Sequence, residues 1–363
     1  MKAAIVHDFV RHGGAEKVLE DMHLLWPEAS IYTLHDERDG RYSDWDIQSS
    51  CLQNIVPASK YRWPFPLYSA LVDCMPKRID WDVDILVSSS VSYSKNVVAP
   101  AGIPHLCYIH RPAMFAYDRR DMFLSGYPKI LHPLLNVFCD RFKKWDQKHA
   151  TNPDVFIANS QYIADYVKQF YGVEAKVVYP GVDIQPFIAA GLAAAPGDYY
   201  FCAVRLEGYK RVDLIIEACN KLQIKLKIAG SGPMRDALEK IAGPTIEFLG
   251  FVDDEDMPGL YANSKGFLFP SEEDFGIAPV EALAAGRPVV ALKKGGTQET
   301  VQHGVTGVHF DEQNLDEIMS ALQAAEEISW DTEVIRQSAL QYSNEVFRQK
   351  IFEIAEEVVA SKQ

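Results

Sequence analysis

Short apolar runs recur along the chain, and stretches with a helical spacing of apolar residues separate them. In the opening, residues 3–6 are apolar, a glycine-containing loop follows, and apolar side chains then recur at Val18, Leu19, Met22 and Leu25. Each short run suits a strand that is buried on both faces of a parallel sheet. The alternation of strand and helix therefore predicts an α/β fold.

The length of 363 residues suits two domains of about 150–200 residues each. Residues 184–198 are rich in Ala, Gly and Pro, which favours a linker between the domains. We therefore expect a first domain over residues 1–183 and a second that begins at residue 199 and continues to about residue 342.

Net charge is −14, and almost all of it lies in the second half: about −1 over residues 1–180 and −13 over residues 181–363. No broad basic stripe is present, so nucleic acid is not expected as a partner. Any phosphate bound by the acidic half would be held by a few placed groups rather than by a general field.

Six cysteines are scattered without a Cys-x-x-Cys pair, which favours free thiols in a reducing compartment. No signal-peptide pattern opens the chain, and no apolar run approaches the ~18 residues of a membrane span. We expect a cytoplasmic protein.

Residues 267–281, FLFPSEEDFGIAPVE, are the most informative stretch. An apolar run ends at Pro270, Ser271 is a candidate N-cap, and a helix is expected from Ala278. Glu273 and Glu281 frame the turn between strand and helix. A carboxylate suits a pair of sugar hydroxyls, because it accepts two hydrogen bonds and offers no competing donor. Ligands of open α/β sheets bind beyond the carboxyl ends of the strands, where this turn is expected.

Other candidates fall at similar junctions. Gly13-Gly14 would let backbone approach a ligand, and His110 directly follows the strand expected over 104–109. Arg205 and Lys210 follow the strand that begins at Tyr199. Cations at the head of a helix are electrostatically unfavourable, which favours a bound anion there.

The pattern E-D-F-G-I-x-x-x-E at 273–281 resembles the signature of a large family of retaining nucleotide-sugar glycosyltransferases, glycosyltransferase family 4 or group 1. The overall resemblance is to O-antigen mannosyltransferases within it. The resemblance implies the GT-B fold, in which two Rossmann-like domains with parallel sheets form the active site in the cleft between them. It also implies that the final helix, within residues 343–363, returns to the first domain.

The resemblance assigns roles to the candidate residues. Glu273 would face the donor sugar, the amides of the turn would face the sugar and diphosphate, and Glu281 would hold the ribose. The catalytic residues implied are His110, Glu273, Arg205 and Lys210. The donor-binding residues implied are Gly13, Gly14, Arg205, Lys210, Gly230, Val252, Glu273, Phe275, Gly276, Ile277 and Glu281.

The expected reaction is retaining transfer of a hexose to a sugar or lipid-linked sugar in cell-surface polysaccharide synthesis. Mannose from GDP-mannose is the first expectation for the donor, and UDP-glucose-type transfer is the alternative. We expect no metal, because Arg205, Lys210 and the turn amides would stabilise the departing diphosphate, and the Asp-x-Asp motifs at residues 80–82 and 82–84 precede a strand rather than follow one. An epimerase, a phosphorylase and a non-catalytic nucleotide-sugar-binding scaffold remain alternatives.

The mixture of bases and aromatics at residues 60–78 is compatible with an acceptor- or membrane-touching lip, or with a loop that packs its aromatics onto the domain. Peripheral contact with the inner face of the cell membrane is thus among the expected interactions. The basic run Arg141–Trp145 could meet an anionic acceptor, but a solvated helix face is the commoner explanation.

Overall fold

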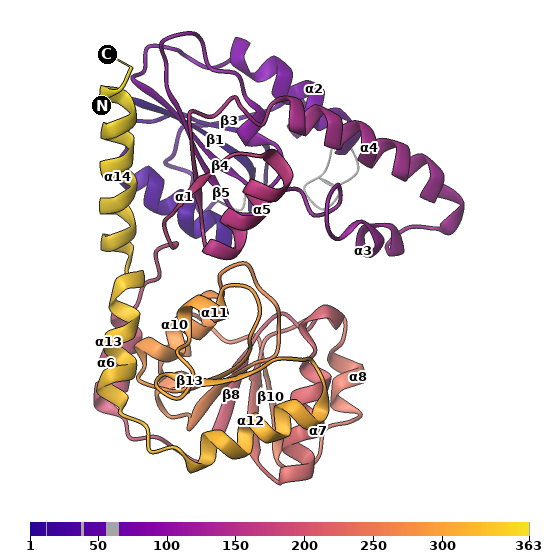
Figure 1. Ribbon diagram of the computed structural model, residues 1–363, viewed down its shortest axis with the longest axis vertical. Coiled ribbons are helices and arrows are strands. Elements are labelled where there is room, and N and C mark those ends of the chain that lie inside the picture. Colours follow the sequence, from indigo (N-terminus) through magenta and orange to yellow (C-terminus); the bar gives the residue numbers. More distant parts are fainter. Residues whose placement is uncertain (12, 38–39, 56–64, 363) are drawn as a thin grey trace. The chain divides into compact units, whose positions relative to one another are not determined.

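The computed structural model describes residues 1–11, 13–37, 40–55 and 65–362. The chain divides into two compact units, Met1–Gly181 with Phe347–Gln363, and Val182–Val346. Each unit carries a parallel sheet with helices against it (Figure 1). The prediction of an α/β chain with two Rossmann-like domains is confirmed.

The sheet of the first unit has the strand order β3-β2-β1-β4-β5-β6-β7, and all described pairs are parallel. The strands are β1 (Ala3–Val10), β2 (Ile31–Asp36), β3 (Ile47–Ser49), β4 (Ile85–Ser90), β5 (His105–Ile109), β6 (Val155–Ala158) and β7 (Ala175–Val177). The main helices are α1 (Gly14–Leu25), α2 (Phe65–Cys74), α3 (Arg120–Ser125), α4 (His132–Lys148), α5 (Gln161–Tyr171) and α14 (Asn344–Ala360).

Apolar side chains of α1 and α14 cover one face of this sheet. Leu19 and Met22 of α1 and Phe347 and Ile351 of α14 are buried in one cluster with the strand residue Ile5. Residues of α2 and α4 are buried against the other face. The final helix thus contributes to the core of the first unit, and its first turn belongs to the second unit.

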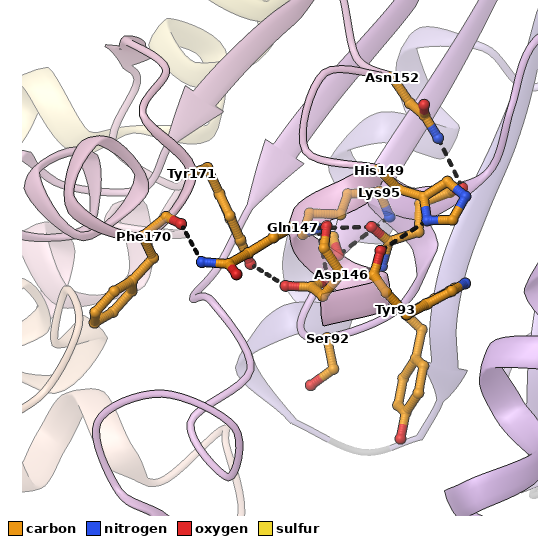
Figure 2. Close-up of polar contacts among 12 residues, drawn as sticks. Ser92, Tyr93, Lys95, Asp146, Gln147, His149, Asn152, Phe170 and Tyr171 are labelled. Carbon is orange, nitrogen blue, oxygen red and sulfur yellow. Dashed lines mark hydrogen bonds and ion pairs between the residues drawn. The ribbon is translucent and has the colours of Figure 1, made fainter. Parts of the chain in front are cut away.

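A buried polar network joins the loop after β4 to α4 and α5 (Figure 2). Lys95 and Asp146 are almost fully buried, and Lys95 Nζ lies 2.7 Å from Asp146 Oδ1. The other Asp146 oxygen, Oδ2, accepts hydrogen bonds from the hydroxyls of Tyr117 (2.7 Å) and Tyr171 (2.8 Å). Asn96 Nδ2 donates to Oδ1 at 2.9 Å. Every charged atom of this pair is therefore satisfied inside the unit.

The sheet of the second unit has the order β10-β9-β8-β11-β12-β13. Its strands are β8 (Tyr199–Ala203), β9 (Lys225–Ala229), β10 (Ile246–Gly250), β11 (Gly266–Phe269), β12 (Val289–Leu292) and β13 (Gly307–Phe310). Its helices are α6 (Gln185–Ala193), α7 (Val212–Leu222), α8 (Arg235–Glu239), α9 (Met257–Ala262), α10 (Ile277–Ala284), α11 (Thr297–Thr300), α12 (Leu315–Glu327) and α13 (Thr332–Ala339). Side chains of α7 and α12 are buried against one face.

The expected linker differs from the structure. Residues 184–198, expected as a linker, contain α6 and belong to the second unit. A Cβ at Gly191 of α6 would lie 2.3 Å from the carbonyl oxygen of Ala285, so small residues are needed where α6 packs closely. The stretch 60–78, for which a lip and a loop packed onto the domain were both open, lies partly outside the described residues. Its described part contains α2, where Tyr68 and Val72 are buried in the core.

Candidate active site

The loops after β8 and β11 bring a cation and a carboxylate together in the second unit. Lys210 ends a short 3-10 helix (Gly208–Lys210), and its ammonium forms an ion pair with the carboxylate of Glu273. Lys210 is buried, whereas the Glu273 side chain is 30% exposed. The hydroxyl of Ser271 donates to the carbonyl oxygen of Lys210 at 3.4 Å and links the two loops. These two predicted residues therefore form one charge-paired group.

Arg205 differs from Lys210 in its surroundings. Its side chain is exposed, and within the described part of the chain no hydrogen bond or ion pair of its guanidinium is present. A guanidinium offers five donors in a planar fork that matches phosphate oxygens. The structure does not bring Arg205 into contact with Lys210, but it leaves Arg205 available to an anion.

The turn before α10 has the backbone that the glycine pattern indicates. Gly276 is the N-cap with φ 89°, and no side chain in the described part of the chain caps the first turn of the helix. Ile277 is the first helical residue, and Phe275 is buried against Tyr342. The prediction that Ser271 is the N-cap was wrong, because its hydroxyl bonds to the carbonyl of Lys210 and the helix starts six residues later.

Two glycines of the loop after β12 hold this turn in place. The amide of Gly296 donates to the carbonyl oxygen of Glu273 at 2.9 Å. A Cβ at Gly296 would lie 2.1 Å from the carbonyl oxygen of Phe275, and one at Gly295 2.1 Å from that of Glu273. Side chains other than hydrogen at these positions would displace the carboxylate-bearing loop.

Glu281 lies on α10 and is hydrogen-bonded to a residue that the sequence did not indicate. The hydroxyl of Tyr261 in α9 donates to Glu281 Oε2 at 2.8 Å. Burial, reinforced by the charge of Glu281, raises the pKa of Tyr261 well above its ordinary value. Tyr261 therefore remains a donor at all physiological pH values and fixes one carboxylate oxygen. Twenty residues separate the two, and no local pattern signals the pair.

Gly230 and Val252 lie on loops that follow β9 and β10. Gly230 has φ 126°, its amide donates to the carbonyl of Gly250 at 2.7 Å, and a Cβ there would lie 2.0 Å from the carbonyl oxygen of Val204. Val252 is half-buried and lines a cavity of about 560 Å³ with residues of α9. That cavity extends to Tyr199 at the amino end of β8, away from the other candidates.

In the first unit, His110 follows β5 as predicted. Its Nε2 lies 2.9 Å from the hydroxyl of Ser89 in β4, and its carbonyl oxygen accepts from Asn159 Nδ2 at 3.0 Å. Burial, with a smaller contribution from the charge of His7, lowers the pKa of His110 to about 3. The ring is therefore neutral near pH 7 and can donate from one nitrogen and accept at the other.

His7 and Glu16 lie in the same region of the first unit. His7 pairs with Ser89 across the sheet and is 1% exposed. Neither of its ring nitrogens is hydrogen-bonded to a described residue. Glu16, in the first turn of α1, places Oε1 3.8 Å from His7 Nε2. A Cβ at Gly13, the N-cap of α1, would lie 2.9 Å from Glu16 Oε2.

Gly13, Gly14, Glu16, His7, Ser89 and His110 thus form one group at the carboxyl ends of β1, β4 and β5. Asp8 holds the adjoining loop. Its carboxylate accepts hydrogen bonds from the successive amides of residues 91–94, for example from Val91 at 3.0 Å. Some of the predicted residues therefore come together within each unit, Gly13, Gly14 and His110 in the first and Lys210 with Glu273 in the second, at the ends where ligands of parallel sheets bind, whereas Arg205 and Val252 lie apart from them.

Among the described residues, no group of three or more His, Cys, Asp or Glu side chains is placed to hold a metal ion. No helix in the described ranges is long and apolar enough to span a bilayer.

Two family models together match most of the chain. The model of Glycosyltransferase Family 4 matches residues 12–186, and that of Glycosyl transferases group 1 matches residues 186–341. An uncharacterized glycosyltransferase of Methanocaldococcus jannaschii is 39% identical over 124 residues, which are 31% of this chain and 32% of the relative.

A GDP-mannose-dependent alpha-(1-6)-phosphatidylinositol monomannoside mannosyltransferase of Mycobacterium tuberculosis is 29% identical over 198 residues, 47% of this chain and 51% of the relative. The chain spans about half or less of the length of the curated relatives that it matches. Among solved structures, Anabaena HepE in complex with UDP has a TM-score of 0.72 at 19% identity, over 98% of this chain and 100% of that one. Sucrose-phosphate synthase from Thermosynechococcus elongatus also has a TM-score of 0.72, at 16% identity over 99% and 100%. These likenesses show the GT-B fold.

Proposed function

With a first half of the Glycosyltransferase Family 4 type and a second half of the Glycosyl transferases group 1 type, the chain is a GT-B protein of the group 1 class, and on that premise we propose that it is a retaining hexosyltransferase. The donor is a nucleotide diphosphate sugar, and the acceptor is a sugar or a lipid-linked sugar of a cell-surface polysaccharide. The observation that carries the proposal is the pairing of Lys210 with Glu273 beside a helix start that no described side chain caps.

In the proposed reaction, the bond between the anomeric carbon and the β-phosphate oxygen breaks, and a bond from the acceptor hydroxyl oxygen to that carbon forms on the same face. The acceptor proton passes to the departing diphosphate. Negative charge that develops on the diphosphate is stabilised by Arg205, Lys210 and the amides at Gly276 and Ile277. The reaction needs no metal if these groups suffice. Trapping of a covalent sugar on Glu273 would refute this direct attack of the acceptor hydroxyl on the face from which the diphosphate leaves.

Lys210 is suited to this role because its partner Glu273 is partly exposed, so a ligand can reach the ion pair. Glu273 is partly exposed, so hydroxyls of a donor sugar can donate hydrogen bonds to its carboxylate while the phosphates approach Lys210. Glu281, oriented by Tyr261, holds the two ribose hydroxyls in the same scheme.

In the first unit, we assign the sugar-facing role to His110, with His7 and Glu16 beside it. His110 is neutral and anchored by Ser89, so it can bind a hydroxyl without adding charge. His7 keeps two buried ring nitrogens without partners in the described chain, which is costly unless a ligand group reaches them.

For the donor we place GDP-mannose first, because a relative at 29% identity is named as GDP-mannose-dependent. UDP-glucose is the second candidate, since the similar Anabaena structure was solved with UDP and with UDP-glucose. We further propose that the enzyme works in the cytoplasm at the inner face of the membrane, where a lipid-linked acceptor would be met.

The first test is thermal stabilisation by GDP, UDP, ADP and their sugar conjugates. A ligand at about 100 times its dissociation constant adds about 2.7 kcal/mol to stability. Stabilisation by one nucleotide series that is lost in Glu281→Ala would identify the donor. Stabilisation by nucleotides without turnover of any sugar conjugate would instead support the non-catalytic scaffold.

The phosphate role is tested by donor hydrolysis in Arg205→Ala and Lys210→Ala. Each is expected to lose about a hundredfold in rate. Lys221→Ala, an exposed cation on α7, is the matched control and is expected to retain the rate. Unchanged hydrolysis in both site variants would refute the assignment.

A further inference from the structure

The outer face of α4 is apolar at one end and basic at the other. Ile130, in the 3-10 turn before the helix, is 86% exposed, and Leu134 and Val137 are 69% and 48% exposed. The same side of the helix continues with Arg141, Lys144 and Lys148, all exposed. We call these six residues the α4 outer face.

The spacing places these side chains on one surface. Positions 134, 137, 141, 144 and 148 recur at intervals of three and four residues, so they share a helix face. The buried positions Leu135, Cys139, Phe142 and Asp146 recur in the same way on the opposite face and pack into the first unit. The exposed apolar residues are therefore not a misplaced core, because the helix already has one.

Two further apolar side chains close by in the sequence are exposed. Leu131 is 40% exposed and Met122 of α3 is 46% exposed. Figure 1 shows α3 and the amino-terminal end of α4 standing away from the sheet of their unit. Exposed aliphatic side chains scattered singly are normal, but a group of them on one projecting end marks an interaction surface.

The charge of this segment identifies the occupant. Residues 129–148 contain Lys129, Arg141, Lys143, Lys144 and Lys148 against two acidic residues. One of these, Asp146, is buried and paired with Lys95, and the other, Asp140, is paired with Arg120 at 2.7 Å. The outer face thus presents uncompensated positive charge next to aliphatic side chains. A bilayer with anionic headgroups complements both features, since aliphatic groups enter the acyl boundary and Lys and Arg meet the phosphates.

We propose that the α4 outer face is a membrane-docking surface that binds anionic lipid. This inference deepens the proposed function, because it rests on a lipid-linked acceptor for its purpose, and it gives the protein a surface that keeps it where such an acceptor lies. The basic run 141–145 was expected from the sequence to be a solvated helix face. In the structure, its residues lie on different faces of α4. Arg141 and Lys144 are exposed, whereas Phe142 is buried.

The test is co-flotation of the full-length protein with vesicles of phosphatidylcholine alone or of phosphatidylcholine and phosphatidylglycerol in equal parts. We expect binding to the anionic vesicles, weaker binding to the neutral ones, and weakening by high salt. Arg141→Glu with Lys144→Glu should lower the partition coefficient about thirtyfold or more. Leu134→Ser with Val137→Ser should lower it about tenfold or more.

Matched controls separate this face from general stickiness. Leu24→Ser removes an aliphatic side chain of α1 that is 65% exposed, and Lys221→Glu reverses an exposed charge on α7. Both should bind vesicles like the unaltered chain. Equal binding by all variants, or no binding by the unaltered chain, would reject the proposal. A concentration-dependent dimer that Leu134→Ser disrupts, without vesicle binding, would reject it in favour of a self-association surface.

Nucleotide-induced stabilisation of the same variants distinguishes failure of this inference from failure of the proposed function. The α4 variants are expected to retain it, because none of their residues belongs to the candidate site. Loss of vesicle binding with intact nucleotide stabilisation would place the lipid contact on α4. Absence of nucleotide stabilisation in the unaltered chain would instead reject the donor assignment, and the vesicle result would stand on its own.

Discussion

The buried ion pair of Lys95 and Asp146 should contribute strongly to the stability of the first unit. We predict that Lys95→Met destabilises the chain by about 3–5 kcal/mol, the cost of breaking a buried pair by removing one partner. The magnitude follows from the surroundings: the side chains of Lys95 and Asp146 are 1% and 0% exposed. Methionine fills most of the space, so the loss is electrostatic rather than that of a cavity.

After this substitution, Asp146 would keep hydrogen bonds from Tyr117, Tyr171 and Asn96 but no cation. Lys95 also lies with Nζ 4.3 Å from the centre of the Tyr171 ring, and that attraction would be lost as well. The tyrosines are neutral donors whose pKa values are raised by burial first and by Asp146 next, so they cannot replace the missing charge. The carboxylate would be left buried and uncompensated.

The assay is thermal unfolding followed by circular dichroism, where a loss of about 3–5 kcal/mol corresponds to a fall of roughly 6–20 °C for a domain of this size. Lys168→Met is the matched control. It removes a lysine with the same 2.7 Å approach to a carboxylate, that of Glu174, but on the surface. That pair is solvated, and the midpoint should remain essentially unchanged. Equal midpoints for both variants would refute the reasoning.

Three further predictions concern the candidate site and acid stability. Tyr261→Phe removes the donor to Glu281 and should weaken nucleotide binding by about 1.5–3 kcal/mol, measured by calorimetry; unchanged affinity would show that the hydroxyl does not matter for Glu281. His7→Phe should lower donor turnover about tenfold or more without lowering the unfolding midpoint, because the ring nitrogens it removes have no described partner; a parallel loss of stability would indicate a structural role. Burial lowers the pKa values of His105 and His110 to about 3, whereas the same groups in the unfolded chain take up protons near pH 6.5. The free energy of unfolding should therefore fall as the pH drops from about 6.5 towards 3, by up to about 1.4 kcal/mol per pH unit for each group. The measurement is the thermal unfolding midpoint as a function of pH, for the unaltered chain and for His105→Gln. A midpoint of the unaltered chain that stays constant between pH 6.5 and about 3 would contradict this prediction.

The features of the fold that could be predicted are those encoded locally. Apolar runs such as residues 267–269 identify the strands, because a strand that is buried on both faces needs a continuous apolar segment. The turn at Gly276 could be predicted because its φ of 89° favours glycine. Candidate residues at strand ends follow from these two signals together.

What could not be predicted depends on contacts between distant segments. The composition of 184–198 indicates a linker, yet the same small residues let α6 approach α10 closely, as the carbonyl of Ala285 beside Gly191 shows. Ser271 has the right type for an N-cap but bonds to the carbonyl of Lys210, sixty-one residues away. The hydrogen bond from Tyr261 to Glu281 leaves no periodic trace in the sequence.

Two buried polar sites of the first unit, the Lys95–Asp146 pair and His7, differ in a way that separates structural from functional residues. Lys95 and Asp146 satisfy one another and every neighbouring donor, so their burial is already compensated within the protein. His7 is as deeply buried, but its ring nitrogens have no partner among the described residues, and Glu16 Oε1 lies 3.8 Å away, beyond hydrogen-bonding distance. An unpaired polar group costs stability and persists where a ligand uses it. Apolar replacement should therefore have opposite effects: it should unfold the network at Lys95, and it should spare stability but remove activity at His7.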